Sequence, residues 1–514
     1  MKPIIYFLPT LNNKYATHMS IIKKLFFYFI AIFSSSCIAK VVTYPVPISE
    51  AVRCTYSVFV NGKELGIYKA LSPEFQGGEY YFTYFDFDGE VDVEVKSTVP
   101  FTKKIPYTRP ASEKAIADKI LVGEVFPRSI KANVEKTRIT FKQDKPFKAI
   151  ILRNERERPL IIFGNPLETN RPDVNDTNVV YIKAGVHYPE KIIRLRNNQI
   201  LYLEGGAVLK SAVLADGENI TICGRGIISL DNYERHKGFS VKMRNCKNLT
   251  VKDVIIKDTI GWSFVLQDCN KVLVDNLKIC TSRMLNDDAI DICNSSNVTI
   301  KNTFTRSQDD CIAIKGMYGS GKQLGRKLTK DLNDKNNNAP VENIEISDCI
   351  FWCDHANVFR IGYECHAPYF KNIKIKNIQI PYYSTYRPIT DYWAHAIFLI
   401  MPTNDMKISD VHFENIEIRS NGKDMFLLIA KPRLVSGIRG ISTAGSIENC
   451  SINNVDVYGK KGHFKGEIYV EGFGENNSVK NLKVSKVTHF NKEKTSKNQK
   501  FFIGKHTKNI KILQ

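Results

Sequence analysis

Short alternating segments that begin at an asparagine recur along most of the chain. Examples are residues 248–256, 343–350 and 372–380. Each is apolar at every second position, bounded by Asn, Asp or Gly, and too short for a helix. One such strand cannot bury its own apolar face, whereas stacked repeats form a continuous core. The pattern therefore predicts an all-β protein whose main part is a right-handed parallel β-helix.

The repeat carries two further expectations. Cys223, Cys246 and Cys269 are spaced 23 residues apart, which predicts equivalent positions in successive coils, with the thiols packed as small apolar groups. Asparagine tolerates left-handed turns and its amide can hydrogen-bond the next coil, which explains its place before the strands. Disulfide bonds are an alternative for an exported protein, but the sequence assigns no pairing. Cys349 and Cys353 have no matching His or Cys pair nearby, which argues against a zinc site.

Residues 40–150 differ from the repeat. They are rich in aromatic residues and turns and lack the asparagine period. Strands punctuated by Gly, Pro and Asp predict a small β-sandwich-like domain. Such a domain either binds carbohydrate or covers the first coil, and we expect a cap because solenoid ends need covering. We therefore expect a signal peptide over residues 1–39, the β-sandwich-like domain over 40–150 and the catalytic parallel β-helix over 151–514.

The first 39 residues predict export. Basic residues after Met19 precede the apolar run 25–33, and small residues follow up to Ala39, as in a secretory signal peptide. The run is too short to span a bilayer comfortably, so we expect cleavage near Ala39 and no stable membrane insertion. An uncleaved anchor and a lipidated Cys37 are the alternatives. The expected location is outside the cell, in the periplasm or at the cell surface.

Composition narrows the class of partner. Hydrophobic residues make up 43% and charged residues 25% of the chain, which excludes a disordered or collagen-like protein. The net charge of +20 favours an anionic partner. Basic residues are spread through the repeats rather than gathered beside aromatic motifs, which argues against nucleic acid. We expect a monomer that binds a polysaccharide, most simply an acidic one.

The densest acidic cluster lies within the repeat. Asp288 and Asp309 are 21 residues apart, close to one coil, and coils of a parallel sheet stack about 4.8 Å apart. Asp288, Asp309 and Asp310 should therefore converge, and their mutual repulsion should raise at least one pKa. One protonated and one ionised carboxyl is the pair that glycoside hydrolysis requires. A solvated turn or a calcium site is the alternative.

The residues of this cluster resemble a known family. Asn286-x-Asp288, followed 21 residues later by Asp309-Asp-Cys-Ile-Ala-Ile-Lys315, is similar to the polygalacturonases of glycoside hydrolase family 28. Two upstream segments also resemble that family's opening coils, at residues 180–187 and 203–210. The resemblance is strongest from about 178 to 316.

The resemblance implies a function and roles for individual residues. It implies a parallel β-helix and hydrolysis with inversion, with no cofactor and no metal. Asp309 would be the general acid, and Asp288 and Asp310 would hold the attacking water as base. Asn286 falls on the motif's asparagine, and Lys315 would be a nearby cation that contacts the substrate.

The chain departs from the family's pattern after an insertion that follows residue 316. The family's Gly-His-Gly is absent, and so is its Arg-Ile-Lys. Either His355 or Asn357 is expected at the place of the family's histidine. Segment 351–362 is similar to related β-helical hydrolases, including the family 49 dextranases, which also carry an N-terminal β-sandwich. The further substrate-binding candidates are His355, Asn357, Arg360 and Tyr363.

Together these patterns predict a secreted glycoside hydrolase, polygalacturonase-like and acting on a pectic or other acidic glycan. The basic residues Lys322, Arg326 and Lys327 of the insertion favour an acidic chain. Two alternatives stay open: a dextranase-like or exo-acting α-glycosidase on a neutral glycan, and a non-catalytic β-helical glycan-binding protein. Trp262, just before the acidic cluster, is a candidate for stacking on a sugar ring.

Overall fold

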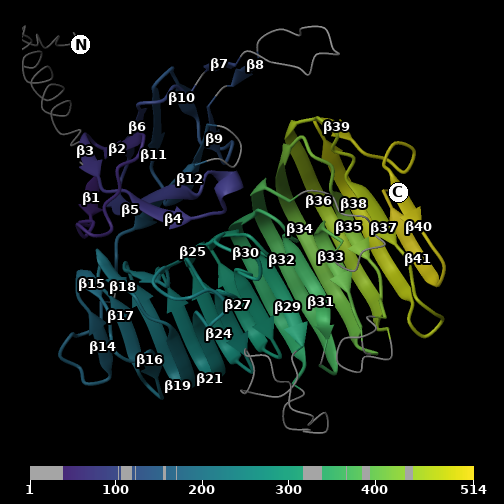
Figure 1. Ribbon diagram of the computed structural model, residues 1–514. Coiled ribbons are helices and arrows are strands. Elements are labelled where there is room, and N and C mark those ends of the chain that lie inside the picture. The colour runs from purple at the N-terminus through teal and green to yellow at the C-terminus, as the bar shows by residue number, and fades with distance from the viewer. Residues whose placement is uncertain are drawn as a thin grey trace, which may run out of the picture.

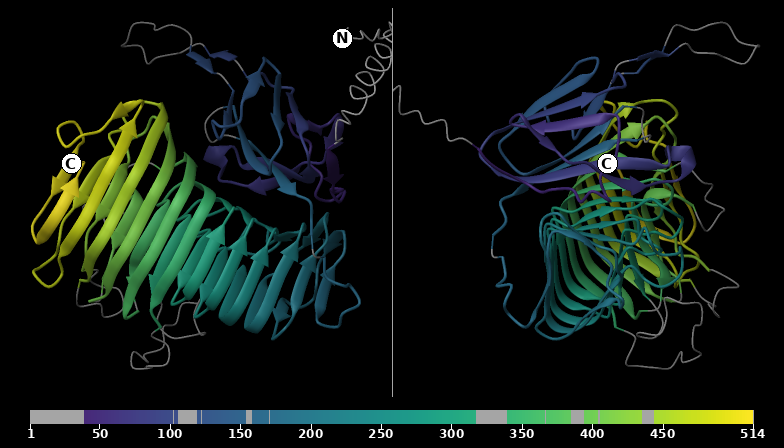
Figure 2. Two further views of the ribbon diagram at one scale, coloured as in Figure 1. Left: turned by 180° about the vertical axis from the view of Figure 1, so that it is seen from behind. Right: turned by 60° about the vertical axis from the view of Figure 1, so that its left-hand side comes forward.

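The computed structural model describes residues 39–101, 103–105, 119–121, 123–153, 158–169, 171–316, 339–365, 367–384, 394–403, 405–434 and 444–513. A small N-terminal domain lies on one side of a long stack of β-coils (Figures 1 and 2). The predicted signal peptide, apart from Ala39, lies outside these ranges, and so do Lys322, Arg326 and Lys327. Within these ranges no helix is both long and apolar enough to cross a membrane.

Two sheets face each other in the N-terminal domain. One has the order β1-β5-β13-β12-β9 with β4 beside β5, and the other has the order β10-β11-β6-β2-β3. Neighbours pair antiparallel except β13 with β5, which is parallel. Alternate residues of β6, such as Val91, Val93 and Val95, are buried in the core between the sheets. The predicted β-sandwich-like domain is thus present.

The elements of this domain have the following bounds: β1 Lys40–Thr43, β2 Tyr56–Val60, β3 Lys63–Leu65, β4 Tyr68–Leu71, η1 Glu74–Gln76, β5 Glu79–Asp88, β6 Val91–Ser97, β7 Lys103–Ile105, β8 Lys119–Leu121, β9 Glu124–Phe126, β10 Ala132–Val134, β11 Arg138–Gln143, β12 Phe147–Leu152 and β13 Leu160–Pro166. The boundary expected at residue 150 falls inside β12. Pairing changes to the parallel coils only between Pro166 and Val179, because β12 and β13 complete a sheet with β5.

From β14 onward the strands pair in parallel with those of the next coil, apart from the small antiparallel pair β38–β39. The first half of the stack contains β14 Val179–Ile182, β15 Gly185–His187, β16 Ile193–Leu195, β17 Ile200–Leu203, β18 Ala207–Leu209, β19 Val213–Gly224, β20 Ile227–Ser229, β21 Val241–Lys252, β22 Ile255–Lys257, β23 Phe264–Gln267, β24 Asn270–Asp275, β25 Lys278–Cys280, β26 Ile290–Cys293, β27 Ser296–Lys301 and β28 Phe304–Ser307.

The second half contains β29 Ile312–Gly316, β30 Val341–Cys353, β31 Phe359–Cys365, β32 Tyr369–Tyr382, β33 Ala396–Met401, β34 Lys407–Asn421, β35 Phe426–Ala430, β36 Ser446–Lys460, β37 Glu467–Val470, β38 Val479–His489, β39 Lys492–Glu493, β40 Phe501–Ile503 and β41 Thr507–Ile512. The strands form three faces around an apolar core. The first face contains β24 and β27, the second β25 and β28, and the third β26 and β29. The predicted parallel β-helix is confirmed.

Asparagines hold successive coils together at the turns, as predicted. Asn248, Asn343 and Asn372 have positive φ angles of 58°, 57° and 55°. Their side chains also bond along the stack, since Nδ2 of Asn372 donates to Oδ1 of Asn343 at 2.7 Å. A second ladder runs between the first and second faces, where Asn415 donates to Asn377 at 3.1 Å and Asn454 to Asn415 at 2.7 Å.

Coil length varies more than the sequence period suggests. Glu218 pairs with Lys247 and Lys247 with Asn270, so these coils differ by six residues. Cys246 and Cys269 lie at the same step of adjacent coils, but Cys223 pairs with Tyr202 inside a strand. The predicted equivalence is therefore right for the later two thiols and wrong for Cys223, because the coil before them is longer.

The N-terminal domain covers the second face. Phe82 and Phe163 share a buried apolar cluster with residues of that face such as Phe304 and Trp352. A buried ion network reinforces this contact. Arg225 Nε lies 2.9 and 2.7 Å from the carboxylate oxygens of Asp86, and its Nη1 lies 2.8 Å from Asp253. The domain therefore packs along the side of the solenoid.

Candidate active site

The acidic residues come together because they share one register column. Asp288, Asp310 and Asn357 each stand two residues before a position where the third-face strands pair. The paired positions are Ile290, Ile312 and Phe359. The turns from the second to the third face therefore stack, and one carboxylate oxygen each from Asp288, Asp309 and Asp310 lies within 4.8 Å of the others. The predicted convergence is observed.

Asp288 is buried against a lysine from the next coil. Lys315 Nζ lies 2.7 Å from Asp288 Oδ2 and 2.8 Å from Asp291 Oδ1. The same Nζ lies 3.7 Å from the ring centroid of Trp262, a cation–π distance. Lys315 thus joins two carboxylates and an aromatic ring beneath the cleft.

Asp310 is held from the following coil. Its Oδ1 accepts hydrogen bonds from Asn357 N at 2.9 Å and from Asn357 Nδ2 at 2.8 Å. Its Oδ2 lies 3.5 Å from Arg360 Nη1. Asn357 Oδ1 in turn accepts from Ala396 N at 2.9 Å, so its side-chain orientation is fixed on both sides. These contacts immobilise the Asp310 carboxylate.

Asp309 is held differently and is more exposed than Asp288 and Asp310. Its oxygens accept from two backbone groups, Asn286 N at 3.0 Å and Asp310 N at 2.9 Å. Among the described residues, it is the member of the three that lines an adjoining cleft of about 200 Å³. His355, Arg360 and His395 line the same cleft. Asp309 is therefore the carboxylate that a substrate would meet.

The environment keeps protons on this cluster near neutrality. Desolvation, followed by the charge of Asp310, raises the pKa of Asp309 to about 6. Desolvation also raises the pKa of Asp288 to about 7, although Lys315 opposes this rise. Burial raises the pKa of Asp291 well above its usual range. A site with protonated and ionised carboxyls side by side can both donate and accept a proton.

Three close carboxylates are also a possible ligand set for a cation. Here Lys315 and Arg360 already supply positive charge to Asp288 and Asp310. A divalent ion at the same place would compete with both. The arrangement therefore suits proton transfer better than metal binding.

A second hollow, of about 380 Å³, adjoins the site on the side of the earlier coils. Trp262, Phe239 and His236 line it, and Asn286 borders both this hollow and the cleft at Asp309. The two spaces therefore flank the acidic residues along the β-helix. This arrangement suits an elongated ligand that crosses the carboxylates.

Comparison with known proteins identifies the family. The sequence profile described as "Glycosyl hydrolases family 28" matches residues 187–463, more than half of the chain and the whole of the acidic cluster. The chain belongs to glycosyl hydrolase family 28. The match to this family agrees with the resemblance to polygalacturonases seen in the sequence.

Relatives of this family 28 hydrolase are distant. A probable polygalacturonase of Arabidopsis thaliana is 30% identical over 152 residues, which is 27% of this chain and 33% of that protein. A polygalacturonase of Persea americana is 28% identical over 150 residues, 27% of this chain and 32% of that protein. The chain thus spans a third of the length of these curated relatives.

Among solved structures, Dex49A from Penicillium minioluteum has a TM-score of 0.60 at 13% identity, covering 92% of this chain and 96% of that one. At such low identity the likeness concerns the fold alone. It extends over the N-terminal domain as well as the β-helix, which agrees with the architecture described above.

The structure sorts the predicted binding residues of this hydrolase into two groups. Asn286, His355, Asn357 and Arg360 line the cleft at Asp309. Lys315 and Tyr363 are buried, and neither lines the two spaces described above. Tyr363 instead accepts a hydrogen bond from Arg360 Nε at its backbone oxygen, at 3.1 Å. Direct sugar contact by Lys315 and Tyr363, expected from the sequence, does not fit this burial.

Three residues near the site were absent from the predicted set. Asp291 shares the ammonium of Lys315, and His395 lines the cleft. Asp287 is fully buried beneath the turn that carries Asp309. Asp291 lies in β26 just after the turn of Asp288, and its place in the same acidic run was the signal that could have marked it. His395 comes from a later coil, and spacing alone held no signal for it.

Proposed function

We propose that this chain is an exported, monomeric hydrolase that cleaves a pectic or other acidic polysaccharide with inversion. The observation that supports the proposal is the set of Asp288, Asp309 and Asp310 beside an open cleft, in a chain of family 28. Export rests on the signal-like residues 1–39, and the acidic substrate rests on the net charge of +20.

Asp309 is the proposed general acid. It borders the cleft, and its raised pKa keeps it protonated in mildly acidic solution. It would donate its proton to the glycosidic oxygen as the bond to the sugar breaks. Asp310, fixed by Asn357 and Arg360, would accept a proton from the attacking water, and Asp288 would help to hold that water.

The stereochemical outcome needs its own test. Inverting glycosidases commonly separate their two carboxyls by about 6.5–9.5 Å, whereas the three carboxylates here approach within 4.8 Å. Inversion is proposed because of family membership, and the spacing by itself favours retention. Proton NMR of freshly released product distinguishes the two, since inversion of an α-linked glycan first yields the β-anomer.

The charge of the cleft favours a second candidate substrate, a neutral glycan. In the part of the chain that the structure describes, Lys315 and Arg360 lie against the carboxylates, and both are engaged by aspartates. A uronate would have to share these cations with Asp288 and Asp310. A dextranase-like or exo-acting α-glycosidase would not need them for recognition.

The experiment compares the protein from Lys40 onward with its Asp309→Asn variant. Both are incubated with polygalacturonate, rhamnogalacturonan, dextran and sulfated galactans, and new reducing ends are counted. We expect release by the unmodified protein on one substrate class and a loss of about 10²–10⁴-fold in the variant. Equal activity of both proteins would overturn the role of Asp309. No release by either would favour the non-catalytic glycan-binding alternative.

A further inference from the structure

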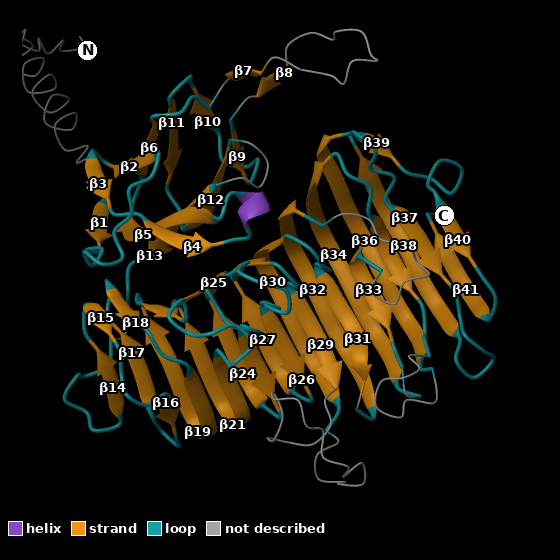
Figure 3. Ribbon diagram, viewed as in Figure 1, coloured by secondary structure: helices purple, strands orange, loops and turns teal. Residues whose placement is uncertain are grey.

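A glutamine of the N-terminal domain reaches the turn that carries Asp309. Gln76 ends the short helix η1 (Glu74–Gln76), drawn in purple between the domain and the β-helix in Figure 3. Its side chain is fully buried, and its Nε2 donates to Gln308 Oε1 at 3.0 Å. Gln308 directly precedes Asp309. The N-terminal domain therefore contacts the residue that precedes the proposed acid, Asp309.

The buried carboxylate of Asp287 also binds the turn that carries Asp309. Asp287 Oδ1 accepts from the backbone N–H groups of Gln308 and Asp309, at 2.7 and 3.1 Å. Its Oδ2 accepts from Ser282 N at 2.9 Å and from Arg283 N at 2.8 Å. Asp287 thus ties the turn of one coil to the turn of the next, and the position of Asp309 depends on both.

The N-terminal domain contacts the neighbouring turn as well. Tyr80 Oη donates to Thr281 O at 2.8 Å, and the Tyr80 ring lies 4.2 Å from the guanidinium carbon of Arg306. Ser282 Oγ donates to Asp354 Oδ2 at 2.6 Å and also lies 3.1 Å from Gln308 Oε1. These hydrogen bonds form one buried network, which continues from the domain into both turns beneath Asp309.

We propose that the N-terminal domain is a working part of the catalytic centre, in which Gln76 is a positioning residue that holds the turn of Asp309 through Gln308. This inference rests on the proposed role of Asp309. Buried hydrogen bonds of this kind are costly to leave unmade, so the turn moves when its partner is removed. Small displacements of a catalytic group reduce turnover strongly. The domain therefore does more than cover the second face of the solenoid.

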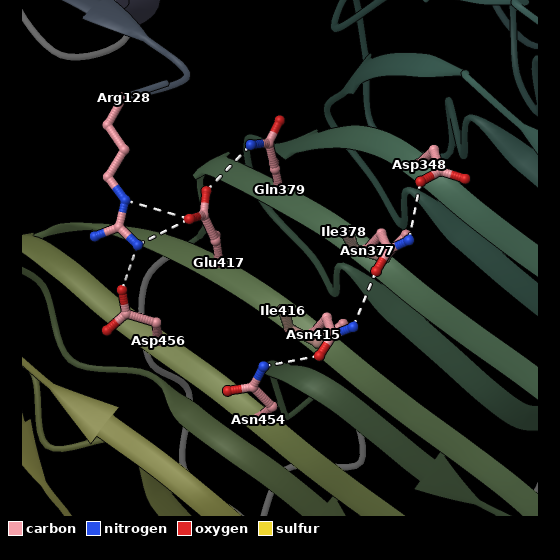
Figure 4. A pocket seen from close by; sticks show the side chains of 10 residues that line it. All are labelled: Arg128, Asp348, Asn377, Ile378, Gln379, Asn415, Ile416, Glu417, Asn454 and Asp456. Carbon is pink, nitrogen blue, oxygen red and sulfur yellow. Dashed lines mark hydrogen bonds and ion pairs between the residues drawn. The ribbon is translucent and has the colours of Figure 1, made fainter. Parts of the chain in front are cut away.

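The test uses Gln76→Leu, which keeps the side-chain volume and removes the amide. The matched control is Arg128→Ala, at another part of the same domain interface. Arg128 Nη2 lies 2.8 Å from Glu417 and 2.5 Å from Asp456 (Figure 4). Both partners belong to coils beyond the carboxylates, in β34 and β36. Each full-length variant is first checked for folding by thermal unfolding.

We expect Gln76→Leu to lower kcat about 10²-fold with little change in KM, and to shift the basic limb of the pH profile. Deuterium exchange at the amides of Gln308 and Asp309 should accelerate in this variant. Arg128→Ala should leave kcat and both amides unchanged. Unchanged kcat and exchange in Gln76→Leu, or equal effects in Arg128→Ala, would overturn the inference.

Deuterium exchange separates this inference from the proposed function. If the unmodified protein cleaves none of the glycans tested, the proposed function fails, but exchange still reports whether Gln76 holds the turn. If the unmodified protein is active and Gln76→Leu matches it in both measurements, the inference alone fails.

Discussion

Lys315 Nζ lies 2.7 Å from Asp288 Oδ2, in a contact between neighbouring coils that excludes almost all solvent. The same ammonium lies 2.8 Å from Asp291 Oδ1 and over the ring of Trp262. The Lys315 ammonium thus pairs with two buried carboxyl groups and contacts Trp262, the aromatic residue that lines the adjoining hollow. The turns that carry the carboxylates thus rest on a buried ionic core.

Removing this cation should destabilise the protein in a pH-dependent way. In Lys315→Met, the carboxyls of Asp288 and Asp291 lose their partner, and breaking a buried pair costs about 3–5 kcal/mol. At pH 5 both carboxyl groups of the folded variant are protonated, because their folded pKa values lie above those of the unfolded chain. The variant then buries neutral groups rather than unpaired charges, so the destabilisation is smaller. The loss of unfolding free energy should therefore grow from pH 5 to pH 8.

Urea unfolding at the two pH values measures this effect. The control is Lys301→Met, which removes a partly exposed pair with Asp275 at 3.5 Å and should cost about 0–1 kcal/mol. A loss in Lys315→Met that is as small as in the control, or that shrinks as pH rises, would contradict the assignment.

Activity should fall as pH rises through about 6. The proposed acid Asp309 must carry a proton in the free enzyme, and desolvation together with Asp310 raises its pKa to about 6. Since kcat/KM reports groups of the free enzyme, its basic limb should bend near this value. A profile measured on the cleaved glycan tests this. A plateau that continues to pH 8 would mean that a different group supplies the proton.

Trp262 should bind substrate without taking part in the chemistry. It lines the hollow beside Asn286, so Trp262→Leu should raise KM for long chains about tenfold, equivalent to about 1.4 kcal/mol, at nearly constant kcat. Tyr188→Leu, which replaces an exposed ring in the first coils, serves as the control. Equal KM values for Trp262→Leu and the unmodified protein would exclude this hollow as a sugar subsite.

The cysteines of the described ranges, of which nine are buried and Cys54 and Cys223 partly buried, should react slowly as thiols. All eleven of them are free, and burial raises the pKa of the Cys349 thiol to about 12. Native protein should therefore react slowly with a thiol reagent, whereas protein unfolded in guanidinium should release at least eleven equivalents. The melting temperature should not change with reductant. A shortfall in thiols, or a lower melting temperature under reduction, would reveal disulfides.

Periodic features were predictable from the sequence. Alternating apolar positions and recurring asparagines define the strands and turns, because each repeat is local in the chain. The meeting of Asp288 with Asp309 and Asp310 followed from a spacing close to one coil. These inferences needed only the stacking distance of a parallel sheet.

Contacts between distant segments were not predictable. Gln76 and Gln308 are separated by 232 positions, and nothing local to either residue marks the pair. β13 lies beyond the boundary expected at residue 150, yet it pairs with β5 and β12 of the N-terminal domain, and nothing local in the sequence marks these pairings. Cys223 was misplaced for a related reason, since the period changes from coil to coil and only pairing reveals the true register.

The asparagine ladder in Figure 4 gives the stack of coils a polarity. Asn377 Nδ2 donates to Asp348 Oδ1 at 3.0 Å. The Oδ1 of Asn377 is then available to Asn415, and that of Asn415 to Asn454. Each coil offers an acceptor to its successor, so the ladder is polar along the stack, and an asparagine at the same place in a further coil would extend it in the same sense.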